Sequence, residues 1–345
     1  MMVLVITRSD DNASVDAVSA AIRARGGTPI RLDSDRYPDL VRLSSVYDRD
    51  GVQRTLRTPA GTFDLGGVSA VWYRRFDAGA ALPVTLGDMR PACVQESRRT
   101  LFGAIAALPC FHMDPLESVR RADHKELQIR RAAELGLDTP RTLFSNDPDE
   151  VRAFFDSVHG RMVTKMQHSF AIYRNGLENV VFTTPVQPDD LETLAGLRYA
   201  PMTFQENIDK AFELRTTIVG RRVMTAAIDS QRSPRTAIDW RRDGVGLIDK
   251  WVPYDLPSAV EGRLLQLVAE LGLNYAACDF IVTPDGRHVF LEVNAVGEFF
   301  WLEQSPGLPI SSAIADVLLD RRPRHPIDVD AWRNGISGSA ANVSA

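Results

Sequence analysis

The chain has 345 residues, of which 44% are hydrophobic and 25% are charged, and its formal net charge is −5 at pH 7. This length suits two or three packed domains, and the composition is that of an ordinary soluble globular protein. The acidic balance argues against a general nucleic-acid binder, although it leaves room for local basic patches.

The first 115 residues predict a parallel α/β domain. Met2–Thr7 is a short apolar run typical of a buried strand, and Thr28–Asp33 predicts a second strand. Ser14 is placed to cap the intervening helix, which ends at about Arg25 before two glycines. A strand, a helix and a strand at the start of a chain indicate a parallel sheet. No G-x-G-x-x-G follows the first strand, so we expect no dinucleotide site there.

A meander, a strand and a helix complete this domain. Leu43–Leu65 predicts a β-meander, with turns at two X-Gly pairs. The remaining predicted elements are the strand Val68–Phe76, which ends in aromatic and basic residues, the helix Arg90–Leu108 and the strand Cys110–Asp114.

Residues 116–200 predict a small second domain that begins with an amphipathic helix, Asp123–Leu137. Its other predicted elements are the strand Thr139–Asp147, the helix Pro148–Val158 capped by Asp147, the strand Gly160–Gln167 and a hairpin over His168–Val181 around Asn175-Gly176.

Residues 201–320 predict a third domain rich in antiparallel strands. The predicted strands are Met202–Ile208, Glu213–Gly220, Arg221–Asp229, Asn274–Val282 and His288–Asn294, and the predicted helices are Ser258–Leu271 and Ile310–Leu319. The segment 321–345 carries little apolar periodicity, and we expect a flexible tail.

Cysteines and apolar runs bear on the compartment. Cys93, Cys110 and Cys278 form no C-x-x-C pair, and their odd number does not indicate a disulfide framework. We therefore expect reduced thiols in a cytoplasmic protein. No apolar run approaches the ~20 residues of a membrane span, and the N-terminus lacks the features of a signal peptide, so we expect no membrane partner.

The last predicted hairpin carries the strongest chemical signal. Strand alternation puts Leu291 and Val293 toward a core, and Glu292 and Asn294 with Phe290 on the other face. Asp279 lies across from this face if the register permits. Two carboxylates and an amide oxygen make the hard-oxygen site that Mg²⁺ prefers. The alternative is the polar outer face of an amphipathic hairpin, and the E-x-N spacing alone does not separate the two.

Two lysines are candidates for binding phosphate. Lys165 lies inside the apolar strand MVTKMQ, where its charge needs a partner. Lys125 lies early in a helix, where phosphate groups are often held. The alternatives are a solvated surface lysine for Lys125 and an edge-strand lysine for Lys165.

A hinge and two arginines complete the candidate nucleotide site. The backbone of an extended hinge can bond an adenine edge, and the residues suited to this are Gln205, Glu206, Asn207 and Ile208. Glu213 is placed to accept hydrogen bonds from ribose hydroxyls. Arg215 shares its strand face, and the fork of an arginine suits phosphate or an acyl-phosphate. Arg241 is a further arginine of this kind. The alternatives are a surface Glu–Arg pair and a charged loop.

From about Asp123 to Leu319 these elements, in this order, resemble the ATP-grasp superfamily. ADHKELQIRRAAELGLDTPRTL resembles its lysine helix and following strand, MVTK its phosphate-lysine strand, FQENI its adenine hinge, ELR its ribose and phosphate contacts, and DFIV…FLEVN its metal hairpin. The resemblance implies a mixed α/β and α+β chain, with the ATP-grasp fold behind an N-terminal parallel α/β (pre-ATP-grasp) domain. Residues 116–200 and 201–320 would be the central and C-terminal ATP-grasp domains, and ATP and Mg²⁺ the cofactors.

Within the superfamily the chain resembles the graspetide-type peptide maturases. The similar segments are VWYRR, TLFSNDP, FELRTTIVG, DSQ…DWR, and EVN followed by G-x-x-x-WLE. Such enzymes activate Glu or Asp side chains of a ribosomally made precursor peptide (leader plus core) as acyl-phosphates, then join them to Ser or Thr hydroxyls or Lys amines. The resemblance implies this function here, with Arg215 and Arg241 on the acyl-phosphate, and a homodimer.

The chain departs from the family pattern after Asn294. The maturases continue Pro-x-Gly-Gln-Trp, whereas this chain has Ala295–Phe299, in which Glu298 replaces the glutamine. This difference bears on the acceptor chemistry. Candidate peptide contacts are Glu298 and the strand end Trp72, Tyr73, Arg74 and Arg75, for which core packing is the alternative.

Two competing functions share parts of this pattern. A ligase that joins a free amino acid or small peptide to a carboxylate, like the ribosomal-protein glutamate ligases, would use the same ATP residues. A non-catalytic peptide-binding homologue is disfavoured, because both lysines and all three metal-type ligands are present.

Overall fold

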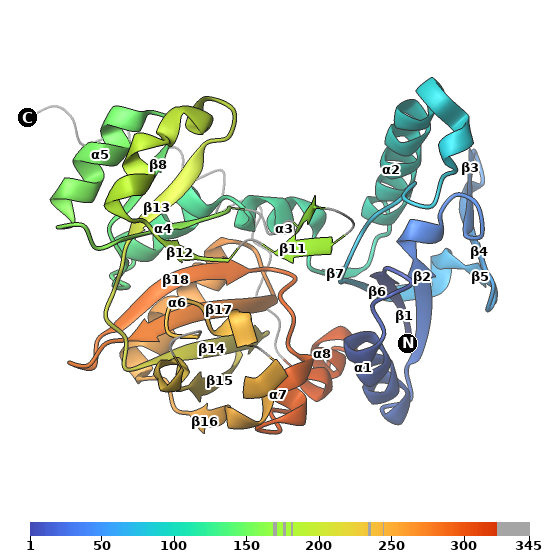
Figure 1. Ribbon diagram of the computed structural model, residues 1–345. Coiled ribbons are helices and arrows are strands. Elements are labelled where there is room, and N and C mark those ends of the chain that lie inside the picture. Colours follow the sequence, from blue (N-terminus) through green and yellow to red (C-terminus); the bar gives the residue numbers. More distant parts are fainter. Residues whose placement is uncertain (168–170, 175–176, 181, 234–235, 244, 323–345) are drawn as a thin grey trace, which may run out of the picture.

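The computed structural model describes residues 1–167, 171–174, 177–180, 182–233, 236–243 and 245–322. Figure 1 shows the elements in three groups, an N-terminal one in blue and teal, a central one mostly in green and a C-terminal one in olive, orange and red. The predicted Asn175-Gly176 turn and nearly all of the predicted 321–345 tail lie outside the described residues. The domain limits near residues 115, 200 and 320 stay a prediction.

The N-terminal group is built on a parallel sheet, as the sequence predicts. Its strands, in the order β2-β1-β6-β7, are β1 (Met2–Thr7), β2 (Thr28–Asp33), β6 (Val68–Tyr73) and β7 (Phe111–Met113). The helices are α1 (Ala13–Ala24) and α2 (Arg90–Ala106), and the antiparallel meander is β3 (Arg42–Asp48), β4 (Gly51–Thr58) and β5 (Gly61–Asp64). The prediction that Ser14 caps this helix is wrong. Asn12 is the N-cap residue, and Ser14 lies within α1, where its hydroxyl donates to Asp11.

The central group has an antiparallel sheet in the order β12-β9-β13-β8. Its elements are α3 (Leu116–Ala122), α4 (Lys125–Glu134), β8 (Thr142–Ser145), α5 (Pro148–Ser157), β9 (Met162–Lys165), the hairpin β10 (Ala171–Arg174) and β11 (Leu177–Val180), β12 (Thr184–Pro185) and β13 (Met202–Glu206). The Asp147 cap is confirmed, because its carboxylate accepts from the Asp149 amide. The predicted helix Asp123–Leu137 is confirmed over Lys125–Glu134, but its predicted start is wrong, because Asp123 follows α3 and the extended backbone of His124 separates α3 from α4.

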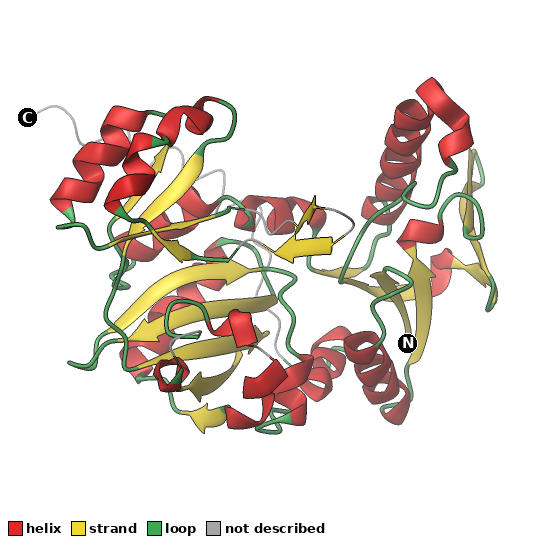
Figure 2. Cartoon of the chain, in the orientation of Figure 1, coloured by secondary structure: helices red, strands yellow, loops and turns green. Residues whose placement is uncertain are grey.

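The C-terminal group is a five-stranded antiparallel sheet in the order β16-β15-β14-β17-β18. Its strands are β14 (Phe212–Val219), β15 (Arg222–Ile228), β16 (Val252–Tyr254), β17 (Tyr275–Val282) and β18 (His288–Asn294), and its helices are α6 (Ser258–Glu270), α7 (Phe300–Gln304) and α8 (Ile310–Leu318). α4 and α6 lie on one face of this sheet, where Leu264 of α6 belongs to the same buried cluster as Phe280 of β17 and Phe290 of β18. In Figure 2 this sheet and the central one lie on one side of the molecule and the N-terminal sheet on the other.

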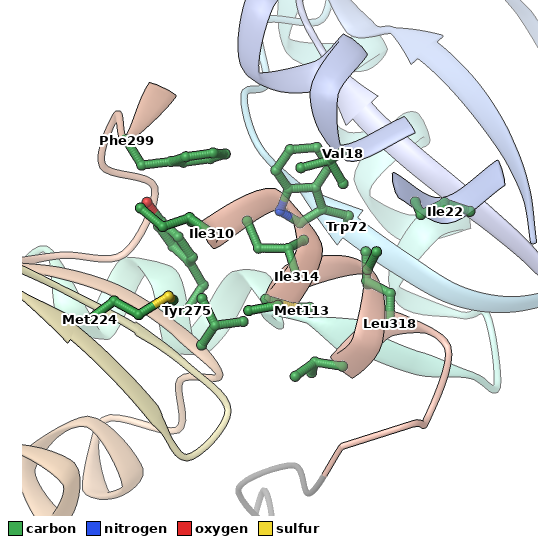
Figure 3. Close-up of a cluster of buried hydrophobic side chains, with 14 of the residues drawn as sticks. Val18, Ile22, Trp72, Met113, Met224, Tyr275, Phe299, Ile310, Ile314 and Leu318 are labelled. Carbon is green, nitrogen blue, oxygen red and sulfur yellow. The ribbon is translucent and has the colours of Figure 1, made fainter. Parts of the chain in front are cut away.

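Helix α8 joins the N-terminal and C-terminal groups through one shared core (Figure 3). The buried side chains of Val18, Trp72 and Met113 pack against Ile314 and Leu318 of α8. Each fully buried side chain of this size contributes about 1.5–3 kcal/mol. The two groups are therefore fixed to each other by packing.

Short 3₁₀ helices connect the larger elements, at Ser34–Arg36, Leu65–Gly67, Val84–Met89, Pro188–Glu192, Leu194–Arg198, Ser230–Arg232, Trp240–Asp243 and Val245–Lys250. Within the described part of the chain, no helix has the length and apolar character that crossing a membrane requires.

Candidate active site

Three charged side chains form a row across the C-terminal sheet. Arg215 on β14 is the register partner of Asp279 on β17, and Asp279 is the register partner of Glu292 on β18. Partners in adjacent strands project from the same face of a sheet, so the three side chains are neighbours. Asn294 follows Glu292 by two residues and shares this face. The register thus brings Asp279 across from Glu292, as the sequence analysis required.

A β-bulge sets this alignment. Phe280 pairs with Phe290 but Asp279 pairs with Glu292, so β18 has one extra residue, Leu291. The expected alternation is wrong here: Phe290 is fully buried with Val293, while Leu291 is only partly buried. An extra residue in one strand moves every side chain before it to the opposite face of the sheet. Simple period-two alternation does not anticipate this change.

Each carboxylate of the row has a cationic partner. The Lys125 ammonium lies 3.0 Å from Glu292 Oε2, and it donates to the Val293 carbonyl at 3.1 Å and to Asn294 Oδ1 at 3.5 Å. Arg215 Nη1 contacts both carboxylate oxygens of Asp279, at 2.8 and 2.9 Å, and its guanidinium stacks over the Trp301 ring at 5.5 Å. The site therefore alternates positive and negative charge at hydrogen-bond distance.

Lys165 and Arg241 belong to the same electrostatic cluster. Burial would raise the pKa of Glu292, but the ammonium groups of Lys125 and Lys165 outweigh it and hold that pKa well below its usual range. Burial lowers the pKa of Lys165, and the Glu292 carboxylate opposes that shift. The pKa of Arg241 is raised, first by its hydrogen bonds to Asp239 and then by the charges of Asp279 and Glu292. The predicted phosphate, metal and acyl-phosphate residues thus converge on one site.

The predicted hinge connects the two antiparallel sheets. Gln205 and Glu206 end β13, and Asn207 and Ile208 begin the link to β14. The Gln205 amide donates to the Thr142 hydroxyl at 3.0 Å. The backbone amides of Glu206 and Asn207 donate to carbonyls of residues 141 and 161, at 2.9 and 2.8 Å. The segment therefore has a fixed path between the sheets.

Glu213 lies on β14, two residues before Arg215, and is held by a lysine. Lys210 Nζ donates to Glu213 Oε1 at 2.8 Å and to the Ile238 carbonyl at 2.9 Å. Burial raises the pKa of the Glu213 carboxyl, and the ammonium of Lys210 opposes the shift. This contact of Lys210 with a predicted site residue was missed from the sequence, although its spacing of three residues from Glu213 was visible.

The predicted peptide contacts divide into buried and open residues. Trp72 is 2% exposed and lies in the shared core, so its predicted contact with a peptide is corrected to core packing. Arg74 is also 2% exposed, and its guanidinium donates to the Val296 carbonyl and to Glu298, so the predicted contact is corrected to an internal one. Tyr73 is partly buried against two cores. Arg75 and Glu298 line a cavity of about 580 Å³.

A buried glutamine was missed. Gln128 lies on α4, three residues after Lys125 and therefore on the same helix face. Its side-chain amide accepts from the Val293 N–H at 2.8 Å and donates to the Val293 carbonyl at 2.8 Å. This pairing fixes the helix that carries Lys125 against the strand that carries Glu292.

Several known proteins match this chain. The family described as the MvdD pre-ATP grasp domain matches residues 2–120. A RiPP-associated ATP-grasp ligase of Chryseobacterium gregarium, solved in complex with ADP and a leader and core peptide, is 41% identical, with a TM-score of 0.90 over 94% of this chain and 98% of its own. The macrocyclase MdnC of Microcystis aeruginosa, bound with precursor peptide MdnA, is 45% identical, with a TM-score of 0.84 over 93% of this chain and 100% of its own.

A more distant match lies outside peptide maturation. Beta-citrylglutamate synthase B of Danio rerio is 27% identical over 128 residues, which span 36% of this chain and 30% of that protein. The identities and near-complete coverage of the two solved ligases decide the family. The chain belongs to the RiPP-associated ATP-grasp ligases, a family of ATP-dependent ligases, and it has the ATP-grasp fold with a pre-ATP-grasp domain.

Proposed function

We propose that this ligase activates Glu or Asp side chains of a ribosomally made precursor peptide as acyl-phosphates and joins them to Ser or Thr hydroxyls or Lys amines of the same peptide. The single observation that carries the proposal is the row of Arg215, Asp279 and Glu292, with two lysines beside it. The peptide-bound relatives support the choice of substrate.

In this proposal Lys125 and Lys165 bind the phosphates of ATP, and Asp279, Glu292 and Asn294 hold Mg²⁺. When bound, Mg²⁺ neutralises charge on the transferred phosphoryl group. The donor set fits such an ion, because two carboxylates and an amide leave positions for water and phosphate oxygens. Among the described residues no cluster of three or more His, Cys, Asp or Glu side chains offers a protein-only metal cage. A set this small is the kind that Mg²⁺ shares with a nucleotide.

The hinge and Glu213 would hold the nucleoside. We assign the backbone groups of Gln205, Glu206, Asn207 and Ile208 to the adenine edge. Glu213 is assigned to the ribose hydroxyls, with Lys210 keeping its carboxylate in place at 2.8 Å. A carboxylate held by a buried lysine keeps its direction, and this favours hydrogen bonding to two adjacent hydroxyls.

The chemistry is two successive displacements. A peptide carboxylate attacks the γ-phosphate, which releases ADP and leaves an acyl-phosphate; an acceptor hydroxyl or amine then attacks the acyl carbon, and phosphate leaves. The protein contributes position and charge neutralisation. We assign Arg215 and Arg241 to the acyl-phosphate. The place of Arg215 in the charge row, where its Nη1 contacts the Asp279 carboxylate, supports its assignment.

The proposed binding region for the peptide is a cavity rather than a set of single contacts. Arg75 and Glu298 line the 580 Å³ cavity together with Trp301, whose ring lies under the Arg215 guanidinium. This cavity lies one side chain from the proposed acyl-phosphate and would receive part of the core peptide. We propose a homodimer in the cytoplasm as the working form.

Mass spectrometry tests the function directly. The protein is incubated with Mg-ATP and a small acidic precursor peptide rich in Thr, Ser, Lys and Glu, of the kind that a neighbouring gene would encode. Loss of one water per link, with one ADP formed for each, is the expected result. A gain of an amino-acid residue mass when free amino acids are supplied would instead identify a ligase of the glutamate-adding kind. ATP turnover without any change in peptide mass would contradict the proposal.

A further inference from the structure

The segment Ala295–Phe299, where this chain departs from the family pattern, is held by three donors. Its successive carbonyls at Val296, Gly297 and Glu298 each accept a hydrogen bond. The donors are Arg74 Nη1 at the end of β6, the Tyr275 hydroxyl of β17 at 2.7 Å, and Arg215 Nη2 of β14 at 3.0 Å. One short loop therefore joins the N-terminal group to the proposed acyl-phosphate arginine.

The Glu298 carboxylate strengthens the same loop. Its Oε1 accepts from the backbone amides of Phe299 and Phe300, at 3.0 and 3.2 Å, and so satisfies the start of α7. Its Oε2 accepts from Arg74 Nη2. Both oxygens are used for holding the chain, while the carbonyl of the same residue holds Arg215. This arrangement suits a positioning role for Glu298 better than a proton-transfer role.

Packing leaves this loop little freedom. A Cβ at Gly297 would lie 2.5 Å from Ala277 Cβ and 2.7 Å from Arg215 Nη2, so only glycine fits between them. Phe299 is fully buried in the shared core, where Figure 3 shows it at the edge of the cluster that contains Trp72. The loop is therefore fixed at both ends, and movement of its middle would move Arg215.

We infer that Arg74 and Glu298 form a positioning pair that sets the place of the Arg215 guanidinium. The inference rests on the proposed function, in which Arg215 binds the acyl-phosphate. Arginine is a long, flexible side chain, and three contacts define its position: the Asp279 carboxylate, the Glu298 carbonyl and the Trp301 ring. Arg74 contacts Glu298, which is one of these three partners of Arg215, and does not itself touch the substrate. The N-terminal group thereby contributes to the chemistry through geometry.

The first test compares two arginines that join the same two groups. Arg74→Met removes the donors to the loop, whereas the control Arg25→Ala removes the contact of Arg25 Nε with Asp316 Oδ1 on α8, at 2.6 Å. Peptide-dependent ADP formation is measured with the precursor peptide described above. Arg74→Met should lower kcat by about tenfold to a hundredfold and leave KM for ATP within about twofold. Arg25→Ala should keep kcat within about twofold of the wild type.

A double-mutant cycle makes the test independent of folding defects in Arg74→Met. Arg74→Lys and Glu298→Gln are the conservative variants, because each keeps one hydrogen bond of the pair. Each should lower kcat less than Arg74→Met does. The double variant should be no slower than the slower single variant, because both act through one contact.

Three results would overturn the inference. These are an unchanged kcat in Arg74→Met, an equal loss in Arg25→Ala, or losses that simply add in the double variant. They are distinct from failure of the proposed function, in which the wild-type protein would leave the peptide unmodified and no variant could be compared.

Discussion

Two carboxylates in this protein, one partly buried and one fully buried, are held by opposite means. Glu292, in the charge row, faces the ammonium groups of Lys125 and Lys165, and its pKa lies well below the usual range. Asp114, just after β7, is 3% exposed and accepts the backbone amides of Asn274 and Tyr275, at 2.7 and 2.9 Å. Burial raises the pKa of Asp114 to about 7, and these hydrogen bonds only partly oppose it.

The opposite pKa shifts of these two carboxylates distinguish a reactive site from a structural contact. A carboxylate kept charged by two lysines can hold a cation or organise phosphate, whereas a carboxylate kept by backbone amides only joins two segments. Asp114 connects the end of the parallel sheet to the start of β17. The electrostatic surroundings of each group therefore indicate its role more clearly than its burial.

The largest effect is expected at Glu292. Glu292→Gln removes the charge that opposes Lys125 and Lys165, so ADP formation with the peptide should fall by at least about a hundredfold. Thermal unfolding should show that the fold persists. Glu270→Gln on the surface of α6 is the matched control and should keep its activity, since Glu270 pairs with Arg131 away from the site. Turnover of Glu292→Gln close to that of the wild type would contradict the metal and phosphate assignment.

Arg215→Lys is expected to have the next largest effect. A lysine keeps the charge but cannot contact the Asp279 carboxylate and the Glu298 carbonyl together, so kcat should fall by about tenfold to a hundredfold. KM for ATP should change little, because the nucleotide contacts are assigned to other residues. Steady-state ADP formation checks both constants, with the exposed Arg222→Lys on β15 as control. A rise in KM without a fall in kcat would move Arg215 from the acyl-phosphate to the nucleotide.

The raised pKa of Asp114 leads us to expect that the stability of the protein depends on pH. Its folded pKa, about 7, lies above its ordinary value of 3.8, so the folded state binds a proton more tightly than the unfolded chain. The stabilising contribution is complete below that ordinary value and is lost as pH rises through about 7. The free energy of unfolding of the wild type, relative to Asp114→Asn, should therefore fall by about 2–4 kcal/mol across this window.

Urea unfolding at several pH values between 4 and 8 measures this difference. Asp114→Asn is the reference because it keeps the shape of the side chain and cannot titrate. A difference that stays constant with pH, or that grows as pH rises, would show that the amide donors outweigh burial.

The smallest effect is expected at exposed ion pairs, which provide a baseline. Arg287 Nη1 lies 3.0 Å from Asp138 Oδ2, but its side chain is 54% exposed. Arg287→Ala should leave the free energy of unfolding nearly unchanged, because exposed pairs are well solvated. Chemical denaturation and the ADP assay check this together. A fall in kcat as large as that expected for Arg215→Lys would contradict the view that buried and exposed charges contribute differently.

Much of the fold follows from short-range signals. The parallel start was predictable because β-branched apolar runs alternate with a helical segment, and the antiparallel hairpin of β17 and β18 because a short turn joins two apolar strands. The break before Lys125 was not, since Asp123 and His124 carry no proline or glycine to mark it. That break makes Lys125 the first residue of α4.

The charge row was predictable in its members but not in its alignment. Glu292 and Asn294 share a face by strand period, and Asp279 was expected opposite them on condition of register. The bulge at Leu291 satisfies that condition, and no local residue preference signals it. The internal contacts of Arg74 and Asp114 could not be predicted for another reason. Their partners, the loop at residue 296 and the start of β17, lie far away in the sequence.

The pairing between Gln128 and Val293 has a consequence for assembly. β18 is the last strand of its sheet, and an unpaired outer strand can recruit a strand from another molecule. The Gln128 amide occupies the backbone groups of Val293, and the Asp138 carbonyl accepts from the Phe290 amide farther along. A nascent chain in which α4 has not yet docked leaves this border open to aggregation. The docked α4 therefore does two things at once: Gln128 covers the backbone of the outer strand, and Lys125 lies beside Glu292 in the proposed site.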